Sequence, residues 1–308
     1  MSRRLPPIIL VLLLVLAGCA SHDQGQNAQD STAAPDTEAT FPVTIGSVTI
    51  AGQPTRIVSL SPSATETLFA LGAGPRVVAV DSLSDYPAPA PHTQLSSLSP
   101  DPEAIAGYHP DLVVASADQN GLGAALQKIS VPLLVMADAK SLDDAYTEFV
   151  QLGKATGHHA EGESLARQVR SDVDKIVADT PKPARPLTYY YELDQTYYTA
   201  TSATFIGGVL NLFGLKNIAD GDNPAAPGGY PQLSAERILQ SNPDLIFLAD
   251  SKCCGQNTQT VGARPGWNTL TAVRDGQVFP LDDDIASRWS PRIVDLVQAI
   301  SDALTRAR

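Results

Sequence analysis

Residues 103–116 read EAIAGYHPDLVVAS, and residues 236–249 read ERILQSNPDLIFLA. Both stretches follow the pattern E-x-I-x-x-x-x-P-D-L and continue into an apolar run, and their glutamates lie 133 residues apart. A second pair of similar stretches begins at Ser63 and Ser202, which are 139 residues apart. Matches in the same order at nearly the same offset indicate an internal duplication. The sequence therefore predicts two lobes of similar build.

Short apolar runs alternate with helical patterns in both halves of the chain. The runs are continuous rather than alternating in hydrophobicity, which is typical of parallel strands buried on both faces. They occupy residues 56–60, 76–80, 112–115, 132–136, 187–193, 245–249 and 277–281, and a last helix is predicted from Ser290 onward. The predicted fold class is α/β, with two Rossmann-like lobes that each contain a central parallel sheet. The predicted N-terminal lobe spans residues 41–140 and the C-terminal lobe residues 181–308.

Residues 141–180 interrupt this alternation with a long helical pattern. Ser141 and Asp144 have the spacing of a helix N-cap, and apolar residues then recur at steps of three and four. The stretch ATGHH at residues 155–159 separates two helical segments, and a proline-rich stretch ends the second. We therefore expect a long, rigid helical connector between the lobes. Because open α/β sheets bind ligands beyond the carboxyl ends of their strands, a ligand cleft is expected between the lobes.

The first residues have the features of an export signal. Arg3 and Arg4 precede an apolar core at residues 8–16, which is too short for a membrane-spanning helix of roughly 20 residues. The core ends in LAGC, which matches the lipobox of bacterial lipoproteins. We expect a signal peptide at residues 1–18, lipidation of Cys19 and a flexible polar tether at residues 19–40. The mature chain would then be extracytoplasmic and anchored to the bacterial cell membrane; an ordinary signal peptide with a chance cysteine is the alternative.

Composition argues against several classes of function. Of the 308 residues, 43% are hydrophobic and 18% are charged, which indicates a globular chain. The formal net charge is −12 and no basic stripe is present, so a nucleic-acid partner is not expected. The sequence has no G-x-S-x-G elbow, Walker A motif or H-E-x-x-H motif, so we do not expect an enzyme. The five histidines are too dispersed to predict a metal site, and no resident cofactor is expected.

Several motifs together resemble a known family. They are RIVSLSPSATETLFALGAG at residues 56–74, SDYP at 84–87, PEAIAGYHPDLVVA at 102–115, YPQLSAERILQSNPDLIFL at 230–248 and RWSPRIVDLVQAI at 288–300. In order and spacing they resemble the substrate-binding lipoproteins of ABC importers for cobalamin (vitamin B12) and ferric siderophores. These are class III periplasmic binding proteins, in which one long helix joins two lobes. The resemblance covers the chain from about residue 41 to its end.

The resemblance implies a solute carrier. The expected function is to capture a cobalamin or another corrinoid and deliver it, without chemistry, to an ABC permease and its ATPase. A ferric siderophore or haem on the same scaffold is the first alternative, so the transported ligand would itself contain cobalt or iron. A lipoprotein enzyme, or a surface interaction protein that has kept the fold, is the alternative from another class. We expect a monomer.

Candidate ligand-binding residues lie where the predicted strands end. Ser61 and Ser63 follow the first strand at a helix start, where backbone N–H groups suit an anionic ligand group. Tyr86 follows the second strand, and aromatic faces suit a flat or macrocyclic ligand. In the second lobe, Tyr198 and Tyr230 occupy equivalent places.

The family resemblance adds residues from the second lobe. Asp284, Arg288 and Tyr198 match positions at which the cobalamin binders contact their ligand, and Asp284 with Arg288 suits the hydrogen bonding of a polar ligand edge. The first lobe departs from the family, because Leu83 and Ser116 stand where the cobalamin binders often have Tyr or Trp, as does a position near Leu98. The identity of the ligand therefore stays open among cobalamin, another corrinoid, haem and a siderophore.

The two glutamates of the duplicated stretch have two interpretations. Glu103 and Glu236 each fall in the first turn of a predicted helix, where an acidic side chain is favoured by the helix dipole. In the family that the chain resembles, glutamates at these places pair with arginines of the permease. We therefore predict that Glu103 and Glu236 dock the two lobes onto the transporter.

Two adjacent cysteines follow the strand predicted at residues 245–249. Cys253 and Cys254 are the thiols that remain once Cys19 is lipidated, and an exported protein usually meets an oxidising environment. A vicinal disulfide that stiffens this loop beside the ligand is our hypothesis. Two free thiols or plain loop residues are the alternatives, because adjacent cysteines strain the geometry that disulfides prefer.

Overall fold

The structure, a computed structural model, describes residues 40–221 and 227–307. The predicted signal peptide, the lipidation site Cys19 and the tether up to residue 39 lie outside the described residues. In the described part of the chain, no helix is long and apolar enough to cross a membrane. All described residues belong to one compact unit.

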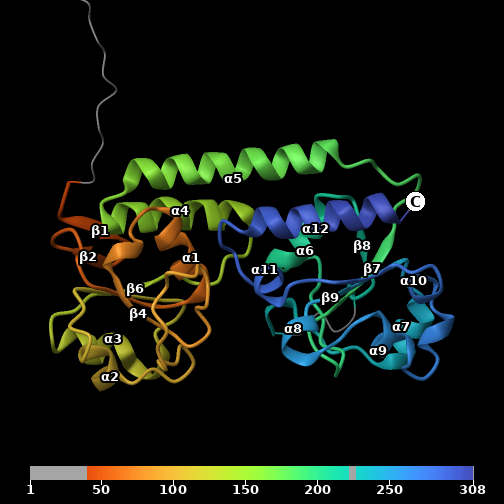
Figure 1. Cartoon of the computed structure of the whole chain (residues 1–308), viewed down its shortest axis with the longest axis horizontal. Coiled ribbons are helices and arrows are strands. Elements are labelled where there is room, and N and C mark those ends of the chain that lie inside the picture. Colours follow the sequence, from red (N-terminus) through yellow and green to blue (C-terminus); the bar gives the residue numbers. More distant parts are fainter. Residues whose placement is uncertain (1–39, 222–226, 308) are drawn as a thin grey trace, which may run out of the picture. The chain divides into compact units, whose positions relative to one another are not determined.

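The N-terminal lobe is built on four parallel strands in the order β4-β3-β5-β6 (Figure 1). These strands are β3 (Ile57–Leu60), β4 (Val77–Val80), β5 (Leu112–Ala115) and β6 (Leu133–Val135). Its helices are α1 (Pro62–Ala70), α2 (Pro102–Ala106) and α3 (Leu122–Gln127), with 3-10 turns at Gly74–Arg76 and Gln119–Gly121. Every residue of β3 and β5 is buried, which agrees with their continuous apolar runs.

A β-hairpin that the sequence analysis did not predict precedes this sheet. Its strands, β1 (Val43–Ile45) and β2 (Val48–Ile50), pair antiparallel. Ile45 and Ile50 pack into the core of the N-terminal lobe. Each strand has three residues, which is too short for the alternation of apolar and polar residues to stand out.

The C-terminal lobe repeats this plan, with parallel strands in the order β8-β7-β9-β10. The strands are β7 (Thr188–Glu192), β8 (Lys216–Asn217), β9 (Leu245–Leu248) and β10 (Val278–Pro280). The helices are α6 (Phe205–Asn211), α7 (Ala235–Ser241), α8 (Ser251–Cys254), α9 (Thr258–Gly262), α10 (Thr271–Arg274) and α11 (Asp283–Ser287), with 3-10 turns at Pro227–Gly229 and Trp267–Thr269. The two sheets have the same topology, because β8, β7, β9 and β10 correspond to β4, β3, β5 and β6. The prediction of two lobes of similar build is therefore confirmed.

Three long helices lie along one side of both sheets: α4 (Leu142–Thr156), α5 (His159–Asp179) and α12 (Ile293–Arg306). Ser141 caps α4 by accepting a hydrogen bond from the Asp144 backbone N–H at 3.2 Å, as predicted. Gly157, with φ of 79°, ends α4, and α5 then runs back along α4 and beside α12 (Figure 1). The helical stretch is thus two helices, and the stretch ATGHH contains the turn between them.

Helix α4 is buried in the cores of both lobes. Tyr146 and Phe149 pack with residues of the C-terminal sheet. Leu152 and Ala155, one to two turns further along, pack with residues of the N-terminal sheet. Because one helix contributes to two close-packed cores, the connection between the lobes is rigid.

Candidate functional site

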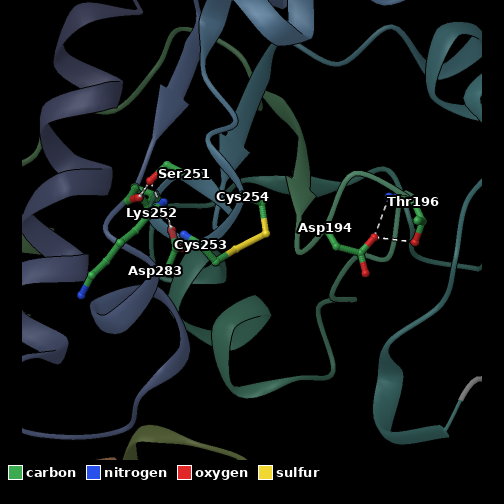
Figure 2. Close-up of a disulfide and its surroundings, with 8 residues drawn as sticks. Asp194, Thr196, Ser251, Lys252, Cys253, Cys254 and Asp283 are labelled. Atoms are coloured by element: carbon green, nitrogen blue, oxygen red, sulfur yellow. Dashed lines mark hydrogen bonds between the residues drawn. A yellow bond between two sulfur atoms is a disulfide. The ribbon is translucent and has the colours of Figure 1, made fainter. Parts of the chain in front are cut away.

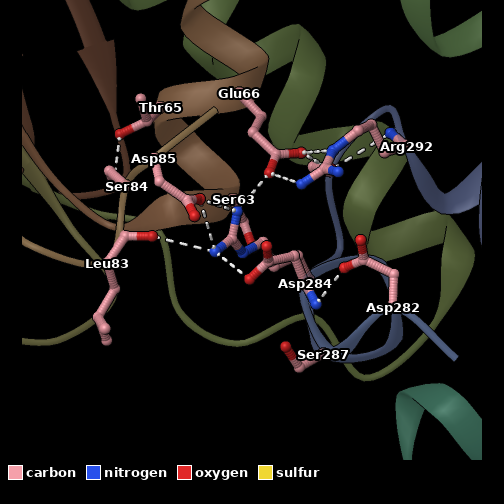
Figure 3. A network of polar contacts seen from close by, with 12 residues as sticks. Ser63, Thr65, Glu66, Leu83, Ser84, Asp85, Asp282, Asp284, Ser287 and Arg292 are labelled. Carbon is pink, nitrogen blue, oxygen red and sulfur yellow. Dashed lines mark hydrogen bonds and ion pairs between the residues drawn. The ribbon is translucent and has the colours of Figure 1, made fainter. Parts of the chain in front are cut away.

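A tightly bonded loop follows β4 at the carboxyl edge of the N-terminal sheet. Asp81 is buried and accepts hydrogen bonds from the Leu83 backbone N–H at 2.9 Å and from the Ser84 hydroxyl at 2.8 Å. Ser84 in turn accepts a hydrogen bond from Thr65 on α1 at 3.0 Å (Figure 3). These bonds tie the loop to α1, so Asp85, the next residue in the chain, extends from a fixed backbone.

Glu66 on α1 is the centre of the polar contacts between the lobes. Its side chain is 2% exposed. It accepts hydrogen bonds from Arg288 at 2.8 Å, from Arg292 at 2.6 and 2.9 Å, and from the Ser290 hydroxyl. Figure 3 shows Glu66 and Arg292 approaching from opposite sides of this interface. Burying a carboxylate is costly unless it is paired, and here both paired cations come from the other lobe.

Arg288 joins Glu66 to a second group of charges. Besides Glu66, Arg288 donates to Asp284 at 2.6 Å, to the Leu83 carbonyl at 3.0 Å and to Asp85 at 3.3 Å. Lys252 pairs with Asp284 and, at 3.4 Å, with Asp85. Partial burial would raise the pKa of Asp85, but Arg288 and Lys252 outweigh it and lower that pKa below its usual value. We call the following six residues the interlobe network: Glu66, Asp85, Lys252, Asp284, Arg288 and Arg292.

The helix that carries Glu66 is capped differently from what its sequence suggests. Ser63 and Glu66 have the S-x-x-E spacing of a capping box. In the structure, however, the N-cap of α1 is Ser61, whose hydroxyl accepts a hydrogen bond from the Ala64 backbone N–H. Glu66 instead bonds across the lobe interface, so this local interpretation of the spacing is wrong.

The structure separates the predicted ligand-binding residues into three groups. Ser61 and Ser63 are 4% and 5% exposed, because both are packed at the start of α1. Asp284 and Arg288 contact each other inside the interlobe network. Tyr86 lies beside that network, with the Arg292 guanidinium 4.1 Å from the centre of its ring, which is a cation–π contact.

The two predicted tyrosines of the C-terminal lobe lie on neighbouring segments. Tyr198 bridges to Gln232, and the backbone of residues 197–201 bonds to that of residues 229–233. Tyr198 and Tyr230 are 43% and 39% exposed. Burial, and then the charge of Asp138 in the N-terminal lobe, raises the pKa of Tyr230. Tyr230 therefore lies close enough to the other lobe to sense its charges.

Cys253 and Cys254 are joined by a disulfide in α8 (Figure 2). Asp283 on α11 accepts hydrogen bonds from the Cys253 backbone N–H at 2.7 Å and from the Lys252 backbone N–H at 3.0 Å. Both cysteines are exposed. Asp283 therefore fixes the helix from which Lys252 extends into the interlobe network, one residue before the disulfide.

A second set of buried charges lies within the C-terminal lobe. Glu192, at the end of β7, is fully buried and pairs through both oxygens with Arg264, at 2.5 Å each. Asp250 follows β9 and is also fully buried, and within the described residues neither of its carboxylate oxygens has a hydrogen-bond partner. Burial, and then the charge of Glu192, raises the pKa of Asp250 to about 7. The sequence analysis did not single out any of these three residues.

Glu103 and Glu236 occupy equivalent and exposed places. Glu103 is in the first turn of α2, which precedes β5, and Glu236 is in the first turn of α7, which precedes the corresponding strand β9. The N-caps of these helices are Asp101 and Ser234, whose side chains accept hydrogen bonds from first-turn N–H groups. Capping therefore does not account for the glutamates, although the favourable effect of the helix dipole remains.

The fold and the motifs match an established family. A family model for periplasmic binding proteins matches residues 57–285. The chain belongs to the periplasmic binding protein family. As a member, it is a substrate-binding protein of an ABC importer, and such proteins bind small-molecule ligands outside the cytoplasm and work with a membrane permease.

This binding protein is similar to relatives with different named ligands. It is 30% identical to an uncharacterized ABC transporter substrate-binding lipoprotein of Bacillus subtilis, over 96% of this chain and 95% of that one. It is 30% identical to a cobalamin-binding protein of Halobacterium salinarum, over 87% of this chain and 75% of that one. The solved periplasmic heme-binding protein of Roseiflexus sp. RS-1 in apo form superposes with a TM-score of 0.73 at 26% identity, over 83% of this chain and 100% of that one.

Sequence reasoning missed four of the six residues of the interlobe network in this binding protein. Glu66, Asp85, Lys252 and Arg292 were not among the candidate residues. Glu66 lies in the motif RIVSLSPSATETLFALGAG, Asp85 in SDYP and Arg292 in RWSPRIVDLVQAI, so the family motifs contained a signal for three of them. The pairing itself could not be found in the same way, because Glu66 and Arg292 are 226 residues apart in the sequence.

Proposed function

We propose that this binding protein captures a corrinoid of the cobalamin type between its lobes and delivers it unchanged, with no resident cofactor. The observation that carries this proposal is the charge balance of the interlobe network. Its three cations, Lys252, Arg288 and Arg292, are paired with its three carboxylates, Glu66, Asp85 and Asp284. A strongly anionic ligand needs unpaired cations, whereas the amide groups of a corrinoid need only hydrogen-bonding partners.

Exposed apolar side chains support a large ligand with broad faces. Tyr86, Tyr198 and Tyr230 are between 39% and 45% exposed, and they lie at strand-end loops of the two lobes. Leu83 and Leu98 in the N-terminal lobe are 56% and 78% exposed. Rings and aliphatic side chains of this kind suit the faces and edges of a macrocycle. A relative named a cobalamin-binding protein agrees with this choice.

Haem or a ferric siderophore is the second candidate, and one observation favours it. Arg288 and Arg292 share Glu66, which belongs to the opposite lobe. If the lobes moved apart, both guanidinium groups would lose that carboxylate and could receive carboxylates of a ligand. One similar solved structure is named a heme-binding protein.

Titration calorimetry with a ligand panel tests the choice. The panel contains cyanocobalamin, cobinamide, haemin and a ferric tricatecholate siderophore. We expect saturable binding of the two corrinoids and much weaker binding of the two anionic ligands. Saturable binding of haemin or the siderophore with none of the corrinoids would overturn the corrinoid proposal in favour of the second candidate.

We further propose that Glu103 and Glu236 dock the two lobes onto the permease. Their equivalent positions, their exposure and the capping of α2 and α7 by other residues support this role. Charge reversal at both positions, Glu103→Lys with Glu236→Lys, should abolish uptake in cells and leave ligand affinity unchanged. Reversal of Asp101, which caps α2, is unsuitable as a control; the exposed Asp275→Lys change serves instead. Normal uptake by the double variant would refute docking through these glutamates.

We also propose that the mature chain is anchored through lipid on Cys19. The motif LAGC supports this, as does the relative named a lipoprotein. Metabolic labelling with a radioactive fatty acid should label the wild-type chain and not Cys19→Ala. Equal labelling of both chains would exclude Cys19 as the attachment site.

A further inference from the structure

Asp85 differs from the other carboxylates that bind Arg288. Arg288 holds Asp284 at 2.6 Å and Glu66 at 2.8 Å, whereas both of its contacts with Asp85 measure 3.3 Å. The side chain of Asp85 is 48% exposed, compared with 20% for Asp284 and 2% for Glu66. Long, solvent-exposed ion pairs contribute little free energy. Asp85 is therefore the partner that Arg288 can exchange most easily.

The backbone of Asp85 is nevertheless held in place. The preceding residues are bonded to the buried Asp81, and the Asp85 backbone N–H bonds to the Leu83 carbonyl at 3.1 Å. The Leu83 carbonyl also accepts from Arg288 at 3.0 Å. If the contact with Arg288 breaks, the Asp85 carboxylate can rotate away but its loop keeps the charge within a few ångströms of the guanidinium.

We propose that Asp85 is a specificity-determining residue: it occupies Arg288 and Lys252 in the ligand-free chain, and it selects against ligands whose polar edge is anionic. The inference rests on the proposed function, in that the ligand binds between the lobes. A ligand oxygen that reaches Arg288 takes the place of the Asp85 carboxylate. An amide oxygen does so without penalty, whereas a ligand carboxylate meets the nearby charge of Asp85. Like charges brought together in a binding site are strongly unfavourable.

Lys252 is a second cation whose attraction for anionic ligands Asp85 reduces. It pairs with Asp85 at 3.4 Å and with Asp284, and it extends from α8, which Asp283 holds by two backbone hydrogen bonds. Asp85 therefore lies between two cations that could otherwise attract an anionic ligand. Its single negative charge lowers the attraction of both.

The test compares Asp85→Asn with Asp138→Asn. The first change removes the charge and keeps the size of the side chain; the second removes a charge that also lies near the lobe interface but has no contact with Arg288 or Lys252 among the described residues. Calorimetry gives the affinities of each chain for cyanocobalamin and for haemin, which carries two carboxylates. We expect Asp85→Asn to tighten haemin binding by about fivefold or more, and cyanocobalamin binding by about twofold at most. Asp138→Asn should leave the ratio of the two affinities as it is in the wild-type chain.

Each outcome decides the matter. An unchanged ratio in Asp85→Asn, or the same change in Asp138→Asn, overturns the inference. If the wild-type chain binds haemin and no corrinoid, the corrinoid proposal fails. The role of Asp85 is then tested with the ratio of the affinities for haemin and for an uncharged ferric hydroxamate siderophore. A chain that binds no member of the panel overturns both proposals, because Asp85 would then compete with nothing. Asp85→Ala, which also removes the hydrogen-bonding group, should give the same change in ratio.

Discussion

The interlobe network and the Glu192–Arg264–Asp250 group use the same chemistry in different settings. Glu66 and Glu192 are both buried carboxylates that pair with arginines. The partners of Glu66 come from the other lobe, so any separation of the lobes would break these pairs and expose them to water. Glu192 and Arg264 belong to one lobe, with Trp267 packed over the guanidinium at 4.5 Å. The comparison teaches that a buried ion pair can be either a joint between two lobes or a fixed part of one core.

The largest expected loss of stability follows removal of the Glu192–Arg264 pair, which lies within one lobe. Glu192→Ala leaves Arg264, whose side chain is 12% exposed, without its carboxylate partner. Removing one partner of a buried pair costs about 3–5 kcal/mol of unfolding free energy. Urea unfolding measures the loss, and ligand affinity should not change. A loss below about 1 kcal/mol would show that Arg264 finds water or another partner, and would end the distinction between the two networks.

Asp250 gives the fixed group a dependence on pH. Its folded pKa of about 7 lies above the usual value of 3.8, so the folded chain binds the proton more tightly than the unfolded chain. This contribution to stability is fully present below pH 4 and is lost as pH rises through about 7. Asp250→Asn cannot ionise, so it should be more stable than the wild-type chain at pH 8, by roughly 2–4 kcal/mol, and the difference should be clearly smaller at pH 5.

Thermal unfolding of both chains at pH 5 and pH 8 measures this difference. The exposed Asp275→Asn change is a matched control that should show no such dependence. Equal melting temperatures of Asp250→Asn and the wild-type chain at pH 8 would mean that Asp250 stays charged and solvated in the folded chain.

Loss of the interlobe pair should lower the free energy of unfolding less than loss of the fixed pair does. It should change the spacing between the two lobes more. Glu66→Gln keeps the size of the side chain but weakens its bonds to Arg288 and Arg292, which should cost about 1–3 kcal/mol. If this change lets the lobes separate, hydration of the arginines offsets part of the cost. Small-angle X-ray scattering should show a larger radius of gyration for Glu66→Gln than for Glu192→Gln. The same radius for both variants would argue that Glu66 is also part of a fixed core.

The smallest effect on stability is expected for an exposed ion pair that neither joins the lobes nor lies in a core. Lys175 and Asp179 pair at 2.6 Å on α5, where their side chains are 74% and 66% exposed. Lys175→Ala should leave the midpoint of urea unfolding unchanged within experimental error, because solvent screens an exposed pair. A loss comparable to that of Glu66→Gln would mean that burial does not explain the ranking of the three pairs.

The sequence predicted the fold well because the fold is expressed in local patterns. Each pattern that indicated the fold occupies a short stretch of sequence. Examples are the continuous apolar runs of β3, β5 and β9 and the duplicated stretches at Glu103 and Glu236. Tyr189, Tyr190 and Tyr191, in the strand predicted at residues 187–193, are fully buried in β7, as expected of a strand covered on both faces.

The site was less accessible because its contacts are not local. Glu66 has the spacing of a capping box, and the same spacing is compatible with a side chain that points to the other lobe. Arg288 was found through a family position, but its pairing with Asp85, 203 residues away, depends on how the two lobes meet. Asp250 has no sequence signal at all, since its burial follows from the packing around the end of β9.

The sharing of α4 between the two cores has a consequence for folding. Tyr146 and Phe149 complete one lobe, and Leu152 and Ala155 complete the other, within a single helix. Neither half of the duplicated chain can bury its apolar surface unless this helix is formed and docked on both sides. Calorimetry of the whole chain should therefore show one cooperative heat-absorption peak, and the halves expressed separately should not fold. The duplication has produced two similar sheets but a single folding unit.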